Sequence, residues 1–305
     1  MNNKENTKNT EQYDDEIGLK ELFTVLWASK VTIIAITTVF AVASVFYSLS
    51  IPNQYKATVS LTSAQQDSGG LSGALNQFGG LASIAGINIG GSESSKTQIT
   101  KEIMTSRSFI ENFIDANDIS AKLGAVIGWD KESNQLMYNQ DAYDSQTQSW
   151  LTDDGAPSSW DLYQSFSGML AIEQQMDLVM VSLEHYSPYL AKEWLDLYLE
   201  AINKHMQARQ VLKVSNNIEY LQRQIKKTSV SEMQAVFYTI IEEQMKSKML
   251  AEANPDYAFV VVASSMVPEQ RSRPKRALIC IFGTLMGGML SVMWVFVLRL
   301  FRSLN

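Results

Sequence analysis

The stretch RSRPKRALICIFGTLMGGMLSVMWVFVLRLFR, residues 271–302, decides the architecture of this chain. Its uncharged, mostly apolar part, residues 277–298, has arginine or lysine on both sides. A helix needs about 20 apolar residues to cross a bilayer core. Hydrocarbon offers no hydrogen-bond partner to a free backbone group, so such a stretch must be helical throughout. Trp294 and Phe301 fall where aromatic rings favour the lipid–water interface. We therefore expect a transmembrane helix over residues 277–298.

A second apolar stretch lies near the start of the chain. Residues 31–51 carry no charge and Pro52 follows them, which predicts a first transmembrane helix. The tail before it is polar and becomes amphipathic after Ile17, as in segments that lie along a membrane surface. A cleaved signal peptide is the alternative, because Ser48-Leu49-Ser50 resembles a cleavage site. The stretch is, however, longer than the apolar core of a signal peptide, which is about 7–15 residues.

The apolar stretches divide the chain into segments with predicted locations. We expect a cytoplasmic tail at 1–30, transmembrane helices at 31–51 and 277–298, a periplasmic domain at 52–274 and a second cytoplasmic tail at 299–305. Lys20 and Lys30 before the first span outnumber Lys56 after it, and basic residues favour the cytoplasmic side. The denser basic cluster before the second span opposes this orientation, but the rule weakens for long translocated domains.

The composition favours a folded chain that does not bind nucleic acid. The chain has 305 residues, of which 46% are hydrophobic and 19% charged, with a net charge of −7. Binding to a phosphate backbone needs a clustered basic face, and here basic residues cluster only beside the apolar stretches. The single cysteine, Cys280, lies inside the second stretch, so we expect no disulfide framework.

The domain begins with the pattern of a strand and continues with a glycine-rich segment. Residues 55–63 alternate between apolar and polar side chains, which is typical of a half-buried strand. Residues 67–91 mix glycine with leucine and isoleucine and lack the motifs of a phosphate-binding loop. Two interpretations of this segment stay open: an apolar loop that touches a partner or lipid, and a loop folded onto its own domain.

The middle of the domain alternates predicted helices and strands. Residues 96–116 have apolar side chains at helical spacing, which predicts a single helix. Residues 130–155 are polar and rich in turn residues. A short helix capped by Ser158 or Ser159 follows, and then two strands at 169–173 and 178–184.

The longest predicted helix begins at Ser187-Pro188, a capping serine followed by proline in the first turn. Its pattern continues to residue 228, a length of roughly 60 Å at 1.5 Å per residue, so the helix must project from a small domain. A second helix at 231–253 returns along it, and residues 257–264 form a strand. The predicted fold class is an α+β membrane protein, with two transmembrane helices bracketing an α/β domain that carries a long protruding helical arm.

The apolar seam of the long helix narrows beyond Met206, as expected of a helix-packing surface rather than a ligand site. We expect an interface between copies of the chain at six apolar positions on the two helices: Val211, Ile218, Ile225, Val236, Phe237 and Ile240. Gly283 and Gly287 form a G-x-x-x-G step, which favours close packing of membrane helices. The step faces either lipid, another membrane protein or the small residues of the first span, which are Ala35, Ala41, Ala43 and Ser44.

The sequence shows no arrangement typical of catalysis or of metal binding. His185 and His205 are isolated, and no cluster has metal-ligand spacing. Asp153 and Asp154 are adjacent carboxylates in a loop, which are more often solvated than catalytic. Glycan cleavage by Asp153, Asp154 or Glu173 is kept only as an alternative. We expect no catalytic residue, no cofactor and no metal.

Several of these motifs together resemble a known family, the chain length determinant (Wzz-type polysaccharide co-polymerase) proteins. The motifs are Tyr55–Leu61 after the first span, Ser106-Arg107-Ser108-Phe109 in an early helix, and Ser187-Pro188-Tyr189-Leu190-Ala191-Lys192-Glu193-Trp194 opening the long helix. Pro268 and Pro274 fit the proline-rich approach to the second span, although Arg271 stands where the family has a third proline. The resemblance covers nearly all of the chain.

The resemblance implies a location, partners and a function. It implies an inner (cytoplasmic) membrane protein of a Gram-negative bacterium, with a periplasmic domain, assembled into a closed homo-oligomeric ring that is an octamer in the family. The implied function is non-enzymatic regulation of the modal length of a lipid-linked surface polysaccharide, O-antigen or similar. The implied partners are the lipid-linked glycan and a Wzy-type polymerase, which could also be what the glycine step faces. The alternative is a membrane-anchored adaptor for a polysaccharide exporter or for a separate tyrosine kinase.

Overall fold

A computed structural model describes residues 26–64, 93–152 and 155–304. The chain separates into two compact units: Met1–Ile51 with Pro274–Asn305, and Pro52–Arg273. The glycine-rich segment 67–91 and the Asp153-Asp154 pair, both considered in the sequence analysis, lie outside the described residues.

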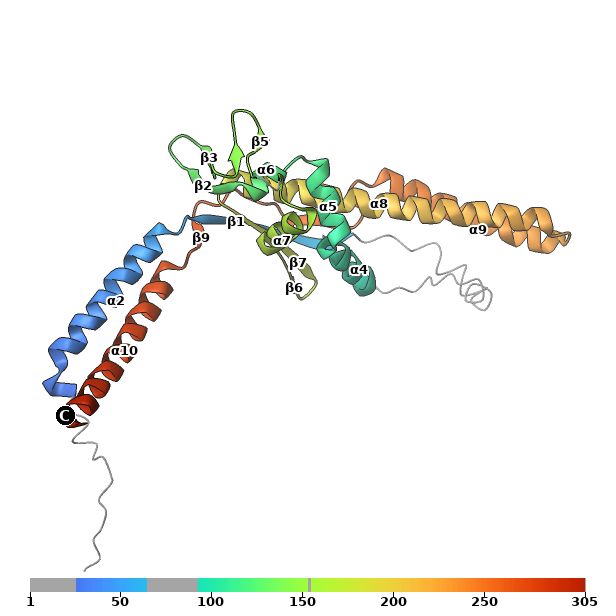
Figure 1. The fold of residues 1–305 in the computed structure, drawn as a ribbon. Helices are drawn as coiled ribbons and strands as arrows, with labels where there is room; N and C mark the ends of the chain where they lie inside the picture. Colours follow the sequence, from blue (N-terminus) through green and yellow to red (C-terminus); the bar gives the residue numbers. More distant parts are fainter. Residues whose placement is uncertain (1–25, 65–92, 153–154, 305) are drawn as a thin grey trace, which may run out of the picture. The chain divides into compact units, whose positions relative to one another are not determined.

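The first unit is a pair of apolar helices, α2 (Lys30–Ser50) and α10 (Arg276–Leu304). They lie side by side and run in opposite directions (Figure 1). Both are long and apolar enough to cross a membrane, judged by length and composition. The predicted apolar helices at each end of the chain are therefore present.

The second unit is built on an antiparallel sheet in the order β6-β7-β1-β8, with β9 also paired to β1. Its strands are β1 (Gln54–Ser63), β6 (Leu170–Gln175), β7 (Leu178–His185), β8 (Phe259–Ala263) and β9 (Arg271–Arg273). The central pair runs from Tyr55 opposite His185 to Thr62 opposite Leu178. Successive side chains of β1 point to opposite faces of the sheet, and those of Ala57, Val59 and Leu61 are almost completely buried. The strands predicted from alternation are confirmed within a few residues.

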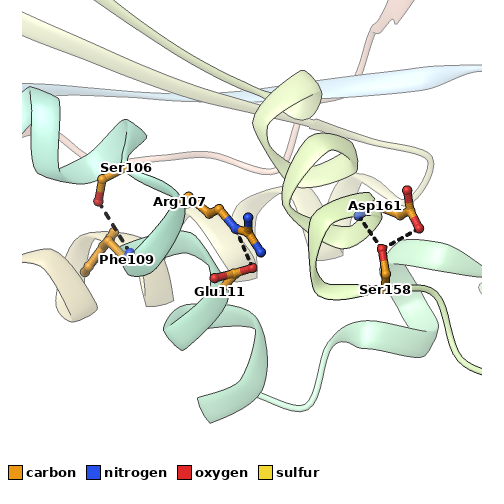
Figure 2. A network of polar contacts seen from close by, with 6 residues as sticks. All are labelled: Ser106, Arg107, Phe109, Glu111, Ser158 and Asp161. Atoms are coloured by element: carbon orange, nitrogen blue, oxygen red, sulfur yellow. Dashed lines mark hydrogen bonds and ion pairs between the residues drawn. The ribbon is translucent and has the colours of Figure 1, made fainter.

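Among the described residues, four shorter helices accompany the sheet: α4 (Glu93–Thr105), α5 (Arg107–Ala116), α6 (Ser120–Gly124) and α7 (Ser159–Met169). The prediction of a single helix over 96–116 is wrong, because the chain breaks at Ser106. This residue is extended, with φ −70° and ψ 141°, and its Oγ accepts the backbone N–H of Phe109 at 3.4 Å (Figure 2). A serine that caps a helix competes with a continuous helical backbone. Apolar spacing continues across the break, so the pattern did not reveal it.

The polar, turn-rich part of the domain contains short hairpins that the sequence pattern did not predict. They are β2 (Val126–Asp130) with β3 (Gln135–Tyr138), and β4 (Tyr143–Asp144) with β5 (Ser149–Trp150). Asn134 and Gln148 take positive φ angles of 53° and 54° in their turns. Strands this short contain too few residues to show alternation.

The core of the domain lies between the sheet and the helices. The long helices are α8 (Pro188–Lys227) and α9 (Ser231–Ala253). The first turns of α8 bury Trp194, Leu195, Tyr198 and Ile202, none of which is more than 1% exposed. The ring of Tyr198 meets Phe109, Phe113 and Phe166 at centroid distances of 5.4, 5.0 and 5.3 Å. Its hydroxyl donates a hydrogen bond to the carbonyl oxygen of Met104, so the core also ties α8 to α4.

Candidate functional site

The long helix divides into two parts with different surroundings. We call residues 188–206 the base, because they pack in the core of the domain. We call residues 207–253 the arm; it contains the rest of α8, the turn and α9, which lie side by side (Figure 1).

The base begins with the Ser-Pro motif that the sequence analysis singled out. Ser187 Oγ accepts the N–H of Leu190 at 3.4 Å, and Pro188 occupies the first turn. The N–H of Ser187 donates to His185 Nδ1 at 3.0 Å. The ring of His185 lies 4.8 Å from that of Trp194. The motif therefore starts α8 and fixes it to the end of β7.

The second motif, around Ser106, has a similar structural role. Arg107 Nε and Glu111 Oε1 form an ion pair at 2.8 Å, one turn apart on α5 (Figure 2). At the start of α7, Ser158 Oγ donates to Asp161 Oδ2 at 2.6 Å and accepts the N–H of Asp161 at 3.2 Å (Figure 2). These contacts cap and stabilise the two helices.

The two histidines lie at separate places in the domain, and neither belongs to a metal-binding cluster among the described residues. Burial lowers the pKa of His185 to about 4, so its imidazole is neutral near pH 7. His205 lies 5.3 Å from the ring of Phe109, and partial burial followed by the charge of Arg209 lowers its pKa. Among the described residues, no group of three or more His, Cys, Asp or Glu side chains could hold a metal ion. Glu173 is exposed on β6.

Asn203 marks the end of the base, and sequence reasoning missed it. Its Oδ1 accepts the N–H groups of Ala258 and Phe259, both at 2.9 Å. Its Nδ2 donates to the carbonyl oxygen of Phe259 at 3.0 Å. The side chain of Asn203 thus hydrogen-bonds the backbone at the start of β8, as a neighbouring strand would. The one signal in the sequence was an amide at a core-facing position, eight residues after Leu195.

The arm is an antiparallel helical hairpin held at both ends by glutamine side chains. Near the base, Gln207 Nε2 donates to the carbonyl oxygens of Ala251 and Asn254, at 2.9 and 3.1 Å. At the turn, Gln234 Nε2 donates to the carbonyl oxygen of Thr228 at 2.8 Å. The buried apolar side chains of the arm are Val214, Leu221, Ile241 and Ala251, which are between 2% and 8% exposed.

The six residues predicted to contact other copies of the chain all lie on the arm. Five of them are half-buried within a single chain: Val211, Ile218, Ile225, Phe237 and Ile240. Val236 is 37% exposed. Because α8 packs on α9, part of the seam is already covered by the same chain.

A second apolar surface of the arm is more exposed than the predicted seam. Tyr238, Met245, Met249 and Leu250 are between 53% and 67% exposed. With Ile241, Glu242, Lys246 and Ala253 they line a shallow groove on α9, which we call the α9 groove. Tyr238, Met245 and Met249 are seven and four residues apart, a spacing that places them on one face of the helix.

The glycines of α10 lie close to α2 within the helix pair. A Cβ atom added to Gly283 would lie 2.4 Å from Ser44 Cβ, and one added to Gly287 would lie 2.5 Å from Phe40 Cβ. Thr37 Oγ1 and Ser291 Oγ are 3.5 Å apart across the pair. Of the four small residues expected opposite the glycines, Ser44 is the one that Gly283 meets. Phe40, which periodicity did not suggest, stands opposite Gly287.

The prolines before the second apolar helix flank β9. Pro268 precedes this strand and Pro274 follows it directly. In β9, Arg273 pairs with Gln54 and Arg271 with Tyr55 at the start of β1. The segment between the prolines therefore forms a fifth strand of the sheet rather than a loop.

The family comparison agrees with the resemblance seen in the sequence. The family model described as Wzz, chain length determinant protein, matches residues 15–117. This range contains α2, β1, α4 and α5, including the Ser106 motif. The match supports a regulator of polysaccharide chain length. Together with the two apolar helices, it indicates a membrane-anchored protein.

Solved structures of polysaccharide co-polymerases are also similar to this chain. A full-length bacterial polysaccharide co-polymerase is 17% identical, with a TM-score of 0.39, over 94% of this chain and 99% of the other. A fragment of WzzB, the polysaccharide co-polymerase from Salmonella Typhimurium, is 14% identical, with a TM-score of 0.28, over 72% of this chain and all of the fragment. A mutant of the Shigella flexneri lipopolysaccharide O-antigen chain-length regulator is 11% identical, with a TM-score of 0.25 and the same coverage. These TM-scores are too low to transfer the position of any residue. The comparison with curated proteins gave no match.

Proposed function

We propose that this chain is a non-enzymatic regulator of the modal length of a lipid-linked surface polysaccharide, O-antigen or similar, made by a Wzy-type polymerase. The match of residues 15–117 to the chain length determinant model carries this proposal. The surfaces described above are surfaces for helix packing, which suit a protein that acts by assembly and positioning.

The proposal includes a location in the inner membrane of a Gram-negative bacterium. Both termini lie in the cytoplasm and residues 52–274 in the periplasm, with spans at 31–51 and 277–298. The excess of Lys20 and Lys30 over Lys56 around the first span supports this orientation. A reporter that is active only in the cytoplasm, fused after Asn305, should be active. Activity of a periplasm-only reporter at that position would contradict the topology.

The proposal also includes assembly of the chain into a closed ring, an octamer by family resemblance. The contact between copies involves the arm, at the six predicted positions and at the α9 groove beside them. Exposed apolar patches with a polar surround mark interaction surfaces. Met249 and Met245 are 67% and 53% exposed in a single chain, so a second copy would remove substantial apolar surface from water.

The function is tested by the length distribution of the surface polysaccharide. Deleting the gene in its own host, and displaying the polysaccharide as a gel ladder, should abolish the preferred length without loss of polymer. Restoring the intact chain should restore the preferred length. Loss of all surface polymer would instead favour the adaptor of an exporter, and an unchanged ladder would contradict both functions.

The assembly is tested by variants that separate contact between copies from pairing within one chain. Met249→Glu places a charge on the exposed groove, whereas Ile218→Glu places one at a half-buried position of the arm. Burying an unpaired charge is strongly unfavourable. Met249→Glu should lower the oligomer mass in detergent and lower the thermal midpoint only by the stabilisation that assembly contributes. Ile218→Glu should lower the thermal midpoint further, because it also loosens the pairing of α8 with α9.

The matched control for this experiment is Gln222→Glu, which adds the same charge at an exposed position of α8. It should leave both the oligomer mass and the thermal midpoint unchanged. If Met249→Glu and Ile218→Glu form assemblies of the same mass as Gln222→Glu, the arm does not form the contact between copies.

A further inference from the structure

The chain enters and leaves the domain at one edge of the sheet. β1 begins at Gln54, shortly after α2 ends at Ser50, and β9 ends at Arg273, shortly before α10 begins at Arg276. Residues 51–53 join α2 to β1, and residues 274–275 join β9 to α10. β1 and β9 also pair with each other, Gln54 with Arg273 and Tyr55 with Arg271. Their common end is therefore the edge of the domain from which the chain continues into both apolar helices.

This edge carries a group of exposed basic side chains, and two of them, Lys56 and Arg273, lie on one face of the sheet. Lys56 stands directly opposite Glu184 in the register of β1 and β7, so both point to the same face. Arg273 Nε lies 2.8 Å from Glu184 Oε2, which places Arg273 on that face too. Arg271, on the same strand, is paired with Tyr55, and a register irregularity separates this pair from the pair of Gln54 and Arg273. We call Lys56, Arg271 and Arg273 the basic edge.

The charge of the basic edge is only partly balanced by acidic neighbours. Glu184 pairs with Arg273, whose side chain is still 63% exposed. Within the described ranges, neither Lys56 nor Arg271 has a carboxylate at ion-pair distance, and both are exposed. Lys275 and Arg276 follow next in the sequence. A chain with a net charge of −7 thus concentrates positive charge where it meets the apolar helices.

Aromatic side chains gather at the same edge, beside Tyr55 on the other face of β1. The rings of Tyr55 and Trp129 are 5.7 Å apart, and those of Trp129 and Tyr189 are 6.2 Å apart, both edge-to-face. Tyr189 is 52% exposed. Tyrosine and tryptophan favour the headgroup level of a membrane, because each has an apolar ring and a polar tip. This cluster is an observation independent of the charges, and it points to the same surroundings.

We propose that the basic edge binds the phosphate groups of anionic phospholipids at the membrane surface, with Tyr55, Trp129 and Tyr189 at the level of the headgroups. Basic residues beside a span attract anionic lipid with an effect that falls off within a Debye length, so they must lie next to the bilayer to act. The three side chains are exposed. Open, exposed charges fit a surface of many headgroups better than a single bound phosphate. Binding would hold the sheet against the lipid independently of assembly through the arm.

The test measures binding of phosphatidylglycerol to the full-length protein in detergent micelles, with phosphatidylcholine as the uncharged comparison. A fluorescent phosphatidylglycerol, titrated into the protein, reports the affinity. The double variant Lys56→Gln/Arg271→Gln should weaken binding about fivefold for each charge removed. The variant Lys56→Arg/Arg271→Lys should restore it, because a headgroup surface responds to charge rather than to side-chain shape.

The matched control is Lys213→Gln/Lys226→Gln, which removes two positive charges from exposed positions on the arm. It should bind phosphatidylglycerol as the unaltered protein does. Raising the salt concentration from 0.1 to 0.5 M should weaken binding to the unaltered protein, since salt screens exposed charges; this measurement stands even where a variant fails to fold.

Three results would overturn the proposal. One is equal affinity for phosphatidylglycerol and phosphatidylcholine, or binding that does not respond to salt. Another is an equal loss of binding in the control and in Lys56→Gln/Arg271→Gln. The third is displacement of phosphatidylglycerol by an equal concentration of a polyprenyl pyrophosphate, which would assign the edge to a lipid-linked carrier instead.

Discussion

The base and the arm are made from one continuous helix, yet they are stabilised in different ways. In the base, α8 lies against the sheet and shorter helices, and Trp194, Tyr198 and Ile202 are at most 1% exposed. In the arm, α8 packs along α9, and among the described residues its buried apolar side chains are Val214 and Leu221. The base is therefore positioned by the core of the domain. The arm keeps most of its surface available for other contacts.

The largest expected effect comes from breaking the base. Trp194→Ala removes a side chain that packs on His185 and Phe166, with ring distances of 4.8 and 6.5 Å, and should cost about 3–5 kcal/mol of stability. Leu221→Ala in the arm should cost about 2 kcal/mol or less, because a two-helix pair can close over the smaller side chain. Thermal unfolding of both variants, followed by circular dichroism, measures the difference. Equal losses would mean that the arm is as tightly packed as the base.

A pH-dependent loss of stability is also expected in the base. His185 has a pKa lowered to about 4 by burial in the folded state, against about 6.5 in the unfolded chain. Between these values the unfolded state binds more protons, so stability is full above pH 6.5 and falls as the pH decreases toward 4. The loss amounts to about 3 kcal/mol.

The measurement for His185 is the difference between the unaltered protein and His185→Gln over this pH range. A glutamine oxygen can still accept the N–H of Ser187, but it does not titrate. The variant should lose less stability on acidification than the unaltered protein, whereas exposed carboxylates affect both alike. Parallel pH profiles would show that His185 can gain a proton without leaving its site.

A smaller effect is expected at the boundary between base and arm. Asn203→Ala leaves the N–H groups of Ala258 and Phe259 without their acceptor, in a place where Phe259 is only 1% exposed. Unpaired buried polar groups cost about 1–3 kcal/mol, so we expect a loss near the middle of that range. Hydrogen exchange should become faster at the amide of Phe259. Asn216→Ala, at an exposed position of α8, is the control and should leave this amide unchanged.

Local patterns were sufficient to predict the long elements of the fold. The capping serine and proline located the start of α8 at Pro188, and alternation located β1. The break at Ser106 escaped prediction, because an apolar face continues across it. β9 was not predicted, because three residues are too few to show the alternation of a strand. Its strand conformation depends on pairing with the distant β1.

Periodicity identified apolar faces but not what covers them. The seam through Val211, Ile218 and Ile225 was predicted as a contact between copies, and α9 of the same chain half-covers these residues. The G-x-x-x-G step was visible in the sequence, but the register that sets Gly287 against Phe40 depends on the packing of α2 and α10. The role of Asn203 could not be predicted from periodicity either, because it depends on β8, which is far away in the sequence.

The smallest expected effect is at the turn of the arm. It can be compared directly with the effect of Asn203→Ala, because both variants remove a side-chain amide. Gln234, like Asn203, joins two segments through a side-chain amide, donating to the carbonyl oxygen of Thr228 at 2.8 Å. The turn is open to water, since Ser229, Val230 and Ser231 are all exposed. When Gln234→Ala removes the donor, water can replace it, so only the net value of a hydrogen bond is lost, about 0.5–1.5 kcal/mol. Thermal unfolding should therefore shift less than for Asn203→Ala.

A local readout distinguishes this loosening of the turn from a loss of the whole arm. Limited proteolysis near Thr228 should become faster in Gln234→Ala, while hydrogen exchange at Val214 and Leu221 stays slow, because those side chains are still buried between α8 and α9. A shift in thermal unfolding as large as that of Asn203→Ala would show that the turn is protected from water. The natural explanation would then be that another copy of the chain covers the tip of the arm, and the comparison of base and arm would have to be made on the assembled ring.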